Sequence, residues 1–286
     1  MSLQGPILIC GEGRSGTTLT SVLLDTHSDI YCAPELHFRG PDNLGPSVLD
    51  AIRRLREDPG LSPRNLNADP SAKRALQFVR RVERCGITVD RLEDHILDSN
   101  GDSDGRLSTF EDRAELVNRM LTEQARAQGA HVWGFKIMRD VLMHRDYLKY
   151  WPSAYFVHLV RDGRDVMASQ MVDHSSWGYP SVETAAKQWT TMVRHCSTKV
   201  PHSHLDTVRY EYLVSDVEQS LTPLLGHFGL EWQENIGSHH ERLEIMAISR
   251  QHPSASQVTR VVNDGSVGRF RRDLSRHQVH EFELLA

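Results

Sequence analysis

Near its start the chain reads Ile7-Leu8-Ile9-Cys10-Gly11-Glu12-Gly13-Arg14-Ser15-Gly16-Thr17-Thr18. An apolar run ends at Cys10, a glycine-rich turn follows, and the pattern predicts a helix from Leu19 to His27. A turn of this kind binds anions, because its backbone N–H groups and the positive end of the helix dipole face the ligand. The stretch therefore predicts an α/β fold with an anion-binding loop after its first strand.

This loop is close to the nucleoside-triphosphate loop G-x-x-x-x-G-K-[ST], but it lacks the lysine. Thr17 stands where the lysine is expected, and the cation comes earlier, as Arg14. The loop is thus suited to a phosphate or sulfate group, and less suited to the β- and γ-phosphates of Mg-ATP. The alternative is a turn whose glycines only allow close packing. We predict that five residues bind the anion: Arg14, Ser15, Gly16, Thr17 and Thr18.

Length and composition set the class of protein. The chain has 286 residues, 39% of them hydrophobic and 25% charged, which is typical of a soluble globular protein. A net charge of −5 argues against a general nucleic-acid binder. No apolar stretch is long enough to span a membrane. Four scattered cysteines, and a first strand that leaves no room for a signal peptide, predict a cytoplasmic protein with reduced thiols.

Strand and helix patterns alternate along most of the chain. Four runs resemble buried strands, the last one weakly: Pro6–Cys10, Val132–Ile137, Ala154–Val160 and Asp206–Tyr210. Helical patterns separate or follow them at Asp140–Tyr150, Arg164–Val172, Val182–Lys199 and Val217–Phe228. This alternation predicts a central parallel sheet covered by helices on both faces. The fold class expected is a three-layer α/β fold of the P-loop type.

The region from about residue 40 to 130 has a different character. It is strongly charged and helix-prone, with candidate helices at Ser71–Arg84, Val89–Leu97 and Glu111–Ala127. We interpret it as a helical insertion within a single domain of residues 1–286. The chain is expected to close with a helix at Ser275–Leu285 that is capped by Ser275.

A second anion-binding signal follows the third predicted strand. The run there is Arg161-Asp162-Gly163-Arg164-Asp165, and Ser169 lies about two helical turns further on. Ligands of open parallel sheets bind beyond the carboxyl ends of the strands, and arginine can bind a phosphate with two hydrogen bonds. A ligand with two separated anionic groups would explain both signals. Solvated charges near a helix start are the alternative for Arg161 and Arg164.

The two motifs together resemble those of the sulfotransferases that use 3′-phosphoadenylyl sulfate (PAPS). The R-S-G-T-T form of the loop is similar to the tyrosylprotein and bacterial branches. The resemblance implies that the first loop holds the 5′-phosphosulfate, that Arg161 and Ser169 hold the 3′-phosphate, and that 3′-phosphoadenosine 5′-phosphate (PAP) is released. The run Leu24–Glu35 is similar to the tyrosylprotein pattern L-D-x-H-x-x-[IV]-x-C-x-x-E, which implies that Glu35 is the catalytic base.

Further positions match the same family. Lys136 resembles the lysine that follows the family's corresponding strand, and Tyr210, in a Y-E-x-L segment, is expected to contact the nucleotide. The run Ser254–Val258 is similar to S-x-D-Q-V, whose serine meets the transferred group, which implies that role for Ser254. Arg269 falls where the tyrosylprotein enzymes have a cofactor-binding lysine.

The chain also departs from the family pattern. Ser256 replaces an Asp, and His37 stands where the tyrosylprotein enzymes have a substrate-facing arginine. Residues 263–268 lack the cations of the cytosolic family's R-K-G-x-x-G motif, and residues 40–129 match nothing in the family pattern. The resemblance therefore identifies the cofactor better than the acceptor.

The residue types suit sulfuryl transfer without a metal. The reaction is an in-line displacement in which Glu35 can accept the acceptor's proton. Arg14, Lys136 and Ser254 can stabilise the negative charge that develops on the bridging oxygen. The histidines at residues 202, 204, 239 and 240 lack the spacing of zinc ligands and are expected at the surface.

We therefore predict a PAPS-dependent sulfotransferase that acts on a hydroxyl acceptor. Peptide tyrosine, carbohydrate, lipid and polyketide-like hydroxyls all fit, and a homodimer is suggested by family habit alone. Two other hypotheses remain at this point: a P-loop kinase-like phosphotransferase that depends on magnesium, and a non-catalytic nucleotide-binding protein.

Overall fold

The fold is built on a five-stranded sheet with the strand order β2-β3-β1-β4-β5. The structure is a computed structural model, and it describes residues 4–36, 44–98, 107–172, 178–242 and 258–286. Every neighbouring pair of strands is parallel. The strands are β1 (Gln4–Gly11), β2 (Ile30–Glu35), β3 (Val132–Met138), β4 (Tyr155–Val160) and β5 (Leu205–Arg209).

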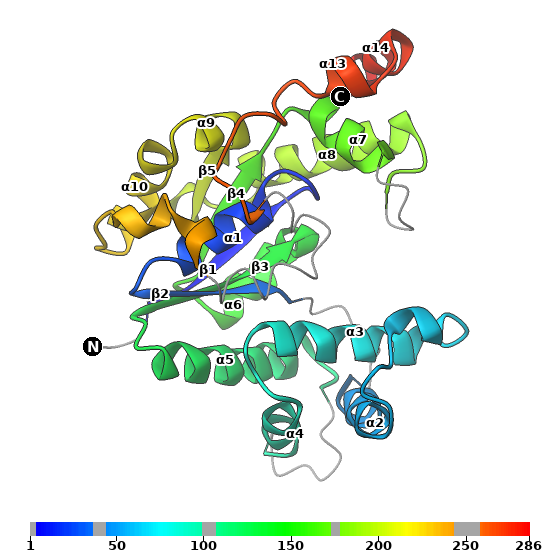
Figure 1. The fold of residues 1–286 in the computed structure, drawn as a ribbon, viewed down its shortest axis with the longest axis vertical. Helices are drawn as coiled ribbons and strands as arrows, with labels where there is room; N and C mark the ends of the chain where they lie inside the picture. Colours follow the sequence, from blue (N-terminus) through cyan, green and yellow to red (C-terminus); the bar gives the residue numbers. More distant parts are fainter. Residues whose placement is uncertain (1–3, 37–43, 99–106, 173–177, 243–257) are drawn as a thin grey trace.

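Helices cover both faces of this sheet, as predicted (Figure 1). Side chains alternate along β1, so Ile7 and Ile9 join one hydrophobic core while Leu8 and Cys10 join the other. The first core includes residues of α1 (Thr17–Asp25), α9 (Tyr210–Ser215) and α10 (Val217–His227). The second includes residues of α5 (Phe110–Ala127), α6 (His144–Tyr150) and α8 (Val182–Thr198). The three-layer α/β fold is confirmed.

The helices of the 40–130 region pack against the second core. They are α2 (Leu44–Glu57), α3 (Pro70–Arg84), α4 (Val89–Leu97) and α5, and Figure 1 shows them gathered on one side of the sheet. Three of them begin at side-chain caps, from Asp69, Thr88 and Thr109. Helix α2 was not predicted, because Gly45 and Pro46 at its start obscure the helical pattern.

Strand β2 was not predicted from the sequence either. Its sequence is Ile-Tyr-Cys-Ala-Pro-Glu, and Pro34 interrupts the pattern of a strand. Pairing with β3 nevertheless forms it, with Ile30 opposite Val132 and a register shift between Ala33 and Glu35. Because β2 lies at the edge of the sheet, a proline that cannot donate a hydrogen bond is tolerated there.

The remaining elements agree with most expectations and correct three. Helices α7 (Gly163–Val172), α13 (Phe270–Asp273) and α14 (Arg276–Leu285) lie near the C-terminus of the chain (Figure 1). Ser275 caps α14, as predicted. The helix expected at Asp140–Tyr150 is a 3₁₀ turn at Arg139–Met143 followed by α6. Tyr210 begins α9 and is not the end of a strand. His239 is buried, not at the surface, and its imidazole Nε2 donates a hydrogen bond to the Val258 carbonyl at 3.1 Å.

Two expectations from composition can be compared with the structure directly. The thiols of Cys10, Cys32, Cys85 and Cys196 are free, and all four are buried. Over the described ranges, no helix combines the length and apolar character that a membrane span requires.

Candidate active site

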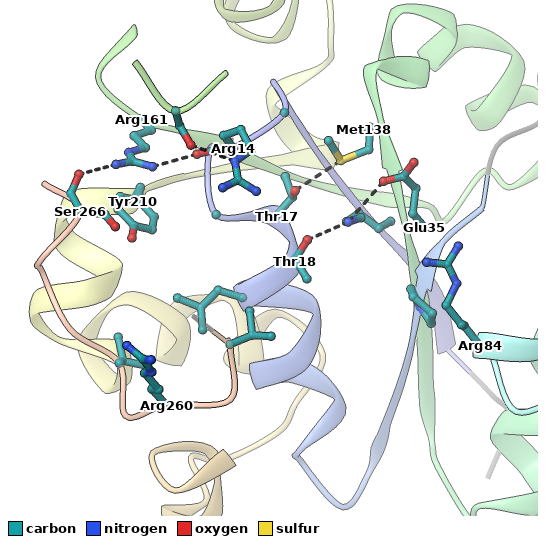
Figure 2. A pocket seen from close by; sticks show the side chains of 18 of the residues that line it. Arg14, Thr17, Thr18, Glu35, Arg84, Met138, Arg161, Tyr210, Arg260 and Ser266 are labelled. Carbon is teal, nitrogen blue, oxygen red and sulfur yellow. Dashed lines mark hydrogen bonds and ion pairs between the residues drawn. The ribbon is translucent and has the colours of Figure 1, made fainter. Parts of the chain in front are cut away.

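A cavity of about 700 Å³ opens at the carboxyl ends of the strands. Its walls come from the loop after β1, the ends of β2 and β3, helix α3, the residue after β4, the start of α9, and the segment 258–266. This volume is typical of a small-molecule site, and the place is where open parallel sheets bind ligands. Figure 2 shows the side chains that point into it.

The loop after β1 is held in shape by buried polar contacts. Arg139 pairs with Glu12, and the Gln170 side-chain amide donates to the Gly13 carbonyl at 3.0 Å. Gly16 has a φ of +99° and precedes α1, whose first turn receives no side-chain cap from it. The N–H groups at the start of α1 are therefore available to an anion in the cavity.

At one end of the cavity, Arg161 connects the two predicted anion sites (Figure 2). Its guanidinium donates to the Arg14 carbonyl at 3.0 Å and to the Ser266 carbonyl, and it lies 4.4 Å from the Tyr210 ring centroid. The Arg14 guanidinium in turn donates to the Ser169 hydroxyl at 2.9 Å. The two loops that were predicted separately thus form one continuous site.

Arg161 is arranged to receive an anion. The residue is 4% exposed, and its Nε has no hydrogen-bond partner among the described residues. Burial lowers the pKa of its guanidinium, although Asp165, at 3.7 Å, provides a partial counter-charge. A buried N–H without a partner is costly. A bound phosphate oxygen would remove this cost.

At the other end lies Glu35 of β2 (Figure 2), and Lys136 is its register partner on the neighbouring strand β3. The Lys136 ammonium lies 3.3 Å from the Glu35 carboxylate and donates to the Thr18 hydroxyl at 2.8 Å. The opposite oxygen of Glu35 accepts from Arg81 of α3 at 3.2 Å. Burial lowers the pKa of the Lys136 ammonium, and the Glu35 carboxylate opposes that shift.

Most of the predicted site residues line this cavity. Those that do are Arg14, Gly16, Thr17, Thr18, Glu35, Lys136, Arg161, Ser169 and Tyr210. Ser15 is buried behind the loop, where its N–H donates to the Glu12 carbonyl at 3.1 Å. Arg269 is not among the lining residues, and it pairs with Asp273 at 2.7 Å. Ser254 and His37 lie outside the described residues.

Several lining residues were not predicted from sequence. Gln77, Arg81 and Arg84 come from α3, where a spacing of four and three residues places them on one helical face. Arg260 and Ser266 belong to the segment that closes the cavity near Arg161. The spacing on α3 was a signal, but nothing local distinguished it from an ordinary solvated face. Among the residues that the structure describes, no group of three or more His, Cys, Asp or Glu side chains is placed to hold a metal.

Comparison with known proteins points to one family over most of the chain. The family model described as "Sulfotransferase family" matches residues 6–234. Protein-tyrosine sulfotransferase 1 of Danio rerio is 25% identical over 98% of this chain and 70% of its own length. Protein-tyrosine sulfotransferase 2 of Gallus gallus is 22% identical over 98% of this chain and 68% of its own length.

Solved structures share the fold. The sulfotransferase domain from the Synechococcus PCC 7002 olefin synthase superposes with a TM-score of 0.57 at 17% identity, over 99% of this chain and 95% of that domain. The sulfotransferase domain from the curacin biosynthetic pathway superposes with a TM-score of 0.54 at 15% identity, over 100% and 98%. At these identities the likeness concerns the arrangement of helices and strands.

Proposed function

The chain belongs to the sulfotransferase family and is a sulfuryl-transferring enzyme, and we propose that PAPS is its donor, a hydroxyl compound its acceptor and Glu35 its general base. The observation that carries the proposal is the position of Arg161. It is buried, has an N–H without a partner in the described part of the chain, and is joined through Arg14 to the loop after β1. Such a site suits a nucleotide with anionic groups at two positions.

Each anionic group of the proposed donor can be matched to residues of the cavity. Arg161, with Ser169 and Arg14 beside it, would hold the 3′-phosphate, and the Tyr210 ring provides an aromatic wall next to it. The backbone N–H groups at the start of α1 would hold the 5′-phosphosulfate. Lys136 reaches the same loop from β3, because its ammonium donates to Thr18. An ammonium therefore stands at the loop although the sequence motif lacks its lysine.

The transfer step follows from the Glu35 end of the cavity. The acceptor oxygen attacks sulfur, the bond between sulfur and the bridging phosphate oxygen breaks, and the hydroxyl proton passes to the Glu35 carboxylate. Lys136 lies 3.3 Å from that carboxylate and can stabilise the charge that develops on the transferred group and leaving oxygen. Sulfated acceptor and PAP are the products.

Calorimetry with PAP tests the donor. We expect PAP to bind with and without EDTA, and Arg161→Met to weaken it by about tenfold to a hundredfold, because charge-assisted hydrogen bonds are lost. Arg164→Met is the matched control, since Arg164 pairs with Asp162 and Glu283 and does not line the cavity. Absence of PAP binding, or binding only with magnesium, would exclude the proposed donor and favour the kinase-like alternative.

Glu35→Gln tests the base. Turnover, followed as PAP release from PAPS, should fall by about a hundredfold to ten-thousandfold while PAP affinity stays near that of the wild type. Turnover that survives in Glu35→Gln would show that another group takes the proton. PAP binding without sulfation of any acceptor by the wild type would favour the non-catalytic hypothesis.

The relatives' names indicate which acceptor to test first. Both sequence relatives described above are protein-tyrosine sulfotransferases, which supports a peptide tyrosine as the starting candidate beside sugar, lipid and polyketide-like hydroxyls. A cytoplasmic location and a homodimer stay predictions. Fractionation and light scattering would test them.

A further inference from the structure

Helix α3 presents a basic face to the cavity beside Glu35. Gln77, Arg81 and Arg84 all line the cavity, and each is partly buried. Arg81 donates to the Glu35 carboxylate at 3.2 Å, and its guanidinium side chain is 24% exposed. Arg84 is the next cation on this face, three residues further along the helix.

Counted over the described residues, the charges at this end of the cavity do not balance. Arg81, Arg84 and Lys136 bring three cations, while Glu35 and the buried Asp140 bring two carboxylates that interact with them. Burial lowers the pKa of the Arg81 guanidinium, and the proximity of Arg84 adds to that effect. When Glu35 takes a proton in the transfer step, one of the two negative charges disappears. The imbalance therefore grows during the reaction itself.

Arg84 is the cation that lacks a counter-charge. Its Nε donates to the Arg80 carbonyl at 3.2 Å, and across the described ranges it forms no ion pair with a carboxylate. The nucleotide does not account for it, because Arg161 and Tyr210 lie at the other end of the cavity from Arg84 (Figure 2). An arginine that lines a cavity and has no carboxylate partner is suited to an oxyanion of a ligand.

We propose that Arg84, assisted by Arg81, binds an anionic group on the acceptor, so that the acceptor is a small hydroxyl compound that carries its own carboxylate or phosphate. This rests on the proposed function, because it takes Glu35 as the point where the hydroxyl is held. Side chains three residues apart on a helix have Cβ atoms about 5–6 Å apart. The anion would therefore lie roughly 5–10 Å from the reacting hydroxyl, which is the span of a small hydroxy acid.

The test compares acids with their neutral analogues on the PAP-loaded enzyme. The probes are 4-hydroxyphenylacetate against 4-hydroxyphenylacetamide, and 5-hydroxypentanoate against 5-hydroxypentanamide, with 4-hydroxybenzylphosphonate as the phosphate-like arm. We expect at least one acid to bind about tenfold or more tightly than its neutral analogue, and Arg84→Gln to reduce that ratio to near one. Arg74→Gln is the control, because Arg74 is exposed on the same helix and does not line the cavity.

The outcomes separate this inference from the proposed function. If the wild type fails to bind PAP, the proposed donor is wrong. If PAP binds equally to the wild type and Arg84→Gln, the acid probes decide the inference. It is overturned if the wild type binds acids and neutral analogues equally, or if it binds no acid measurably. It is also overturned if Arg84→Gln still prefers the acids. A preference seen only with an acidic tyrosine peptide would also overturn the assignment to a small acid.

Discussion

Replacing Gly16 by alanine tests the link between the loop after β1 and the nucleotide end of the cavity. Gly16 has a φ of +99°, and a Cβ at this position would lie 2.6 Å from Cδ2 of the Tyr210 ring. That distance is shorter than real Cβ contacts allow, so the ring must move. The ring also lies under Arg161, at 4.4 Å from its guanidinium carbon. A single methyl group is thus expected to disturb the loop after β1, the Tyr210 ring and the Arg161 guanidinium.

The size of the effect follows from three contributions. A non-glycine residue in the left-handed backbone conformation costs about 1–2 kcal/mol. Forcing the tyrosine off its preferred rotamer costs about 0.5–1.5 kcal/mol. Losing the contact between Arg161 and the ring costs about 0.5–2 kcal/mol. We therefore expect Gly16→Ala to lower the free energy of unfolding by roughly 2–5.5 kcal/mol and to weaken PAP binding.

Two other glycines isolate the contributions. Gly229 has a φ of +69° with nothing within 4 Å of an added Cβ, so Gly229→Ala should cost only the backbone term, about 1–2 kcal/mol. Gly226 lies in α10, also in open space, and Gly226→Ala should stabilise the fold by about 0.5–1 kcal/mol. The difference between Gly16→Ala and Gly229→Ala then measures the steric part.

The assay is urea unfolding followed by tryptophan fluorescence, with PAP calorimetry on the same samples. Adding Tyr210→Ala removes the ring that the new methyl group meets. In that background Gly16→Ala should cost no more than Gly229→Ala does, which is a coupling that a double-mutant cycle reports. The reasoning is refuted if Gly16→Ala costs as little as Gly229→Ala on its own, or if its cost is the same with and without the tyrosine ring.

Three further outcomes are expected. Burial raises the pKa of Asp25 to about 6, so the folded state binds this proton more tightly than the unfolded state. Stability should therefore fall by about 2 kcal/mol as the pH rises from 4 to 7. Asp25→Asn should flatten that fall in urea unfolding at pH 4 and pH 7, and an unchanged slope would contradict the assignment. Lys136→Met should lower turnover by about a hundredfold, since its ammonium contacts both Glu35 and Thr18, and near-normal turnover would show that it is not needed. Ser169→Ala should weaken PAP binding by about tenfold, because the hydroxyl that accepts from the Arg14 guanidinium is lost, and equal affinity by calorimetry would argue against the site.

Local patterns were sufficient for most of the scaffold. Apolar runs predicted β1, β3, β4 and β5 to within a residue or two at each end, because a buried strand is encoded by its own side chains. The glycine-rich loop and the arginine after β4 were also visible, since each is a short motif at a strand end. What the patterns did not contain was β2, whose proline breaks the local signal and whose pairing with β3 makes the strand.

The site itself depends on contacts between segments that are distant in sequence. Glu35 meets Lys136 because β2 pairs with β3, and it meets Arg81 because α3 packs against the same core. Arg161 joins the Arg14 loop and the segment at Ser266 across more than a hundred residues in each direction. Local sequence thus specifies which strands and anion-binding loops exist, since these depend on period and composition. Which side chains share one cavity is decided by packing, because no periodicity within a segment reports the partner that it will meet.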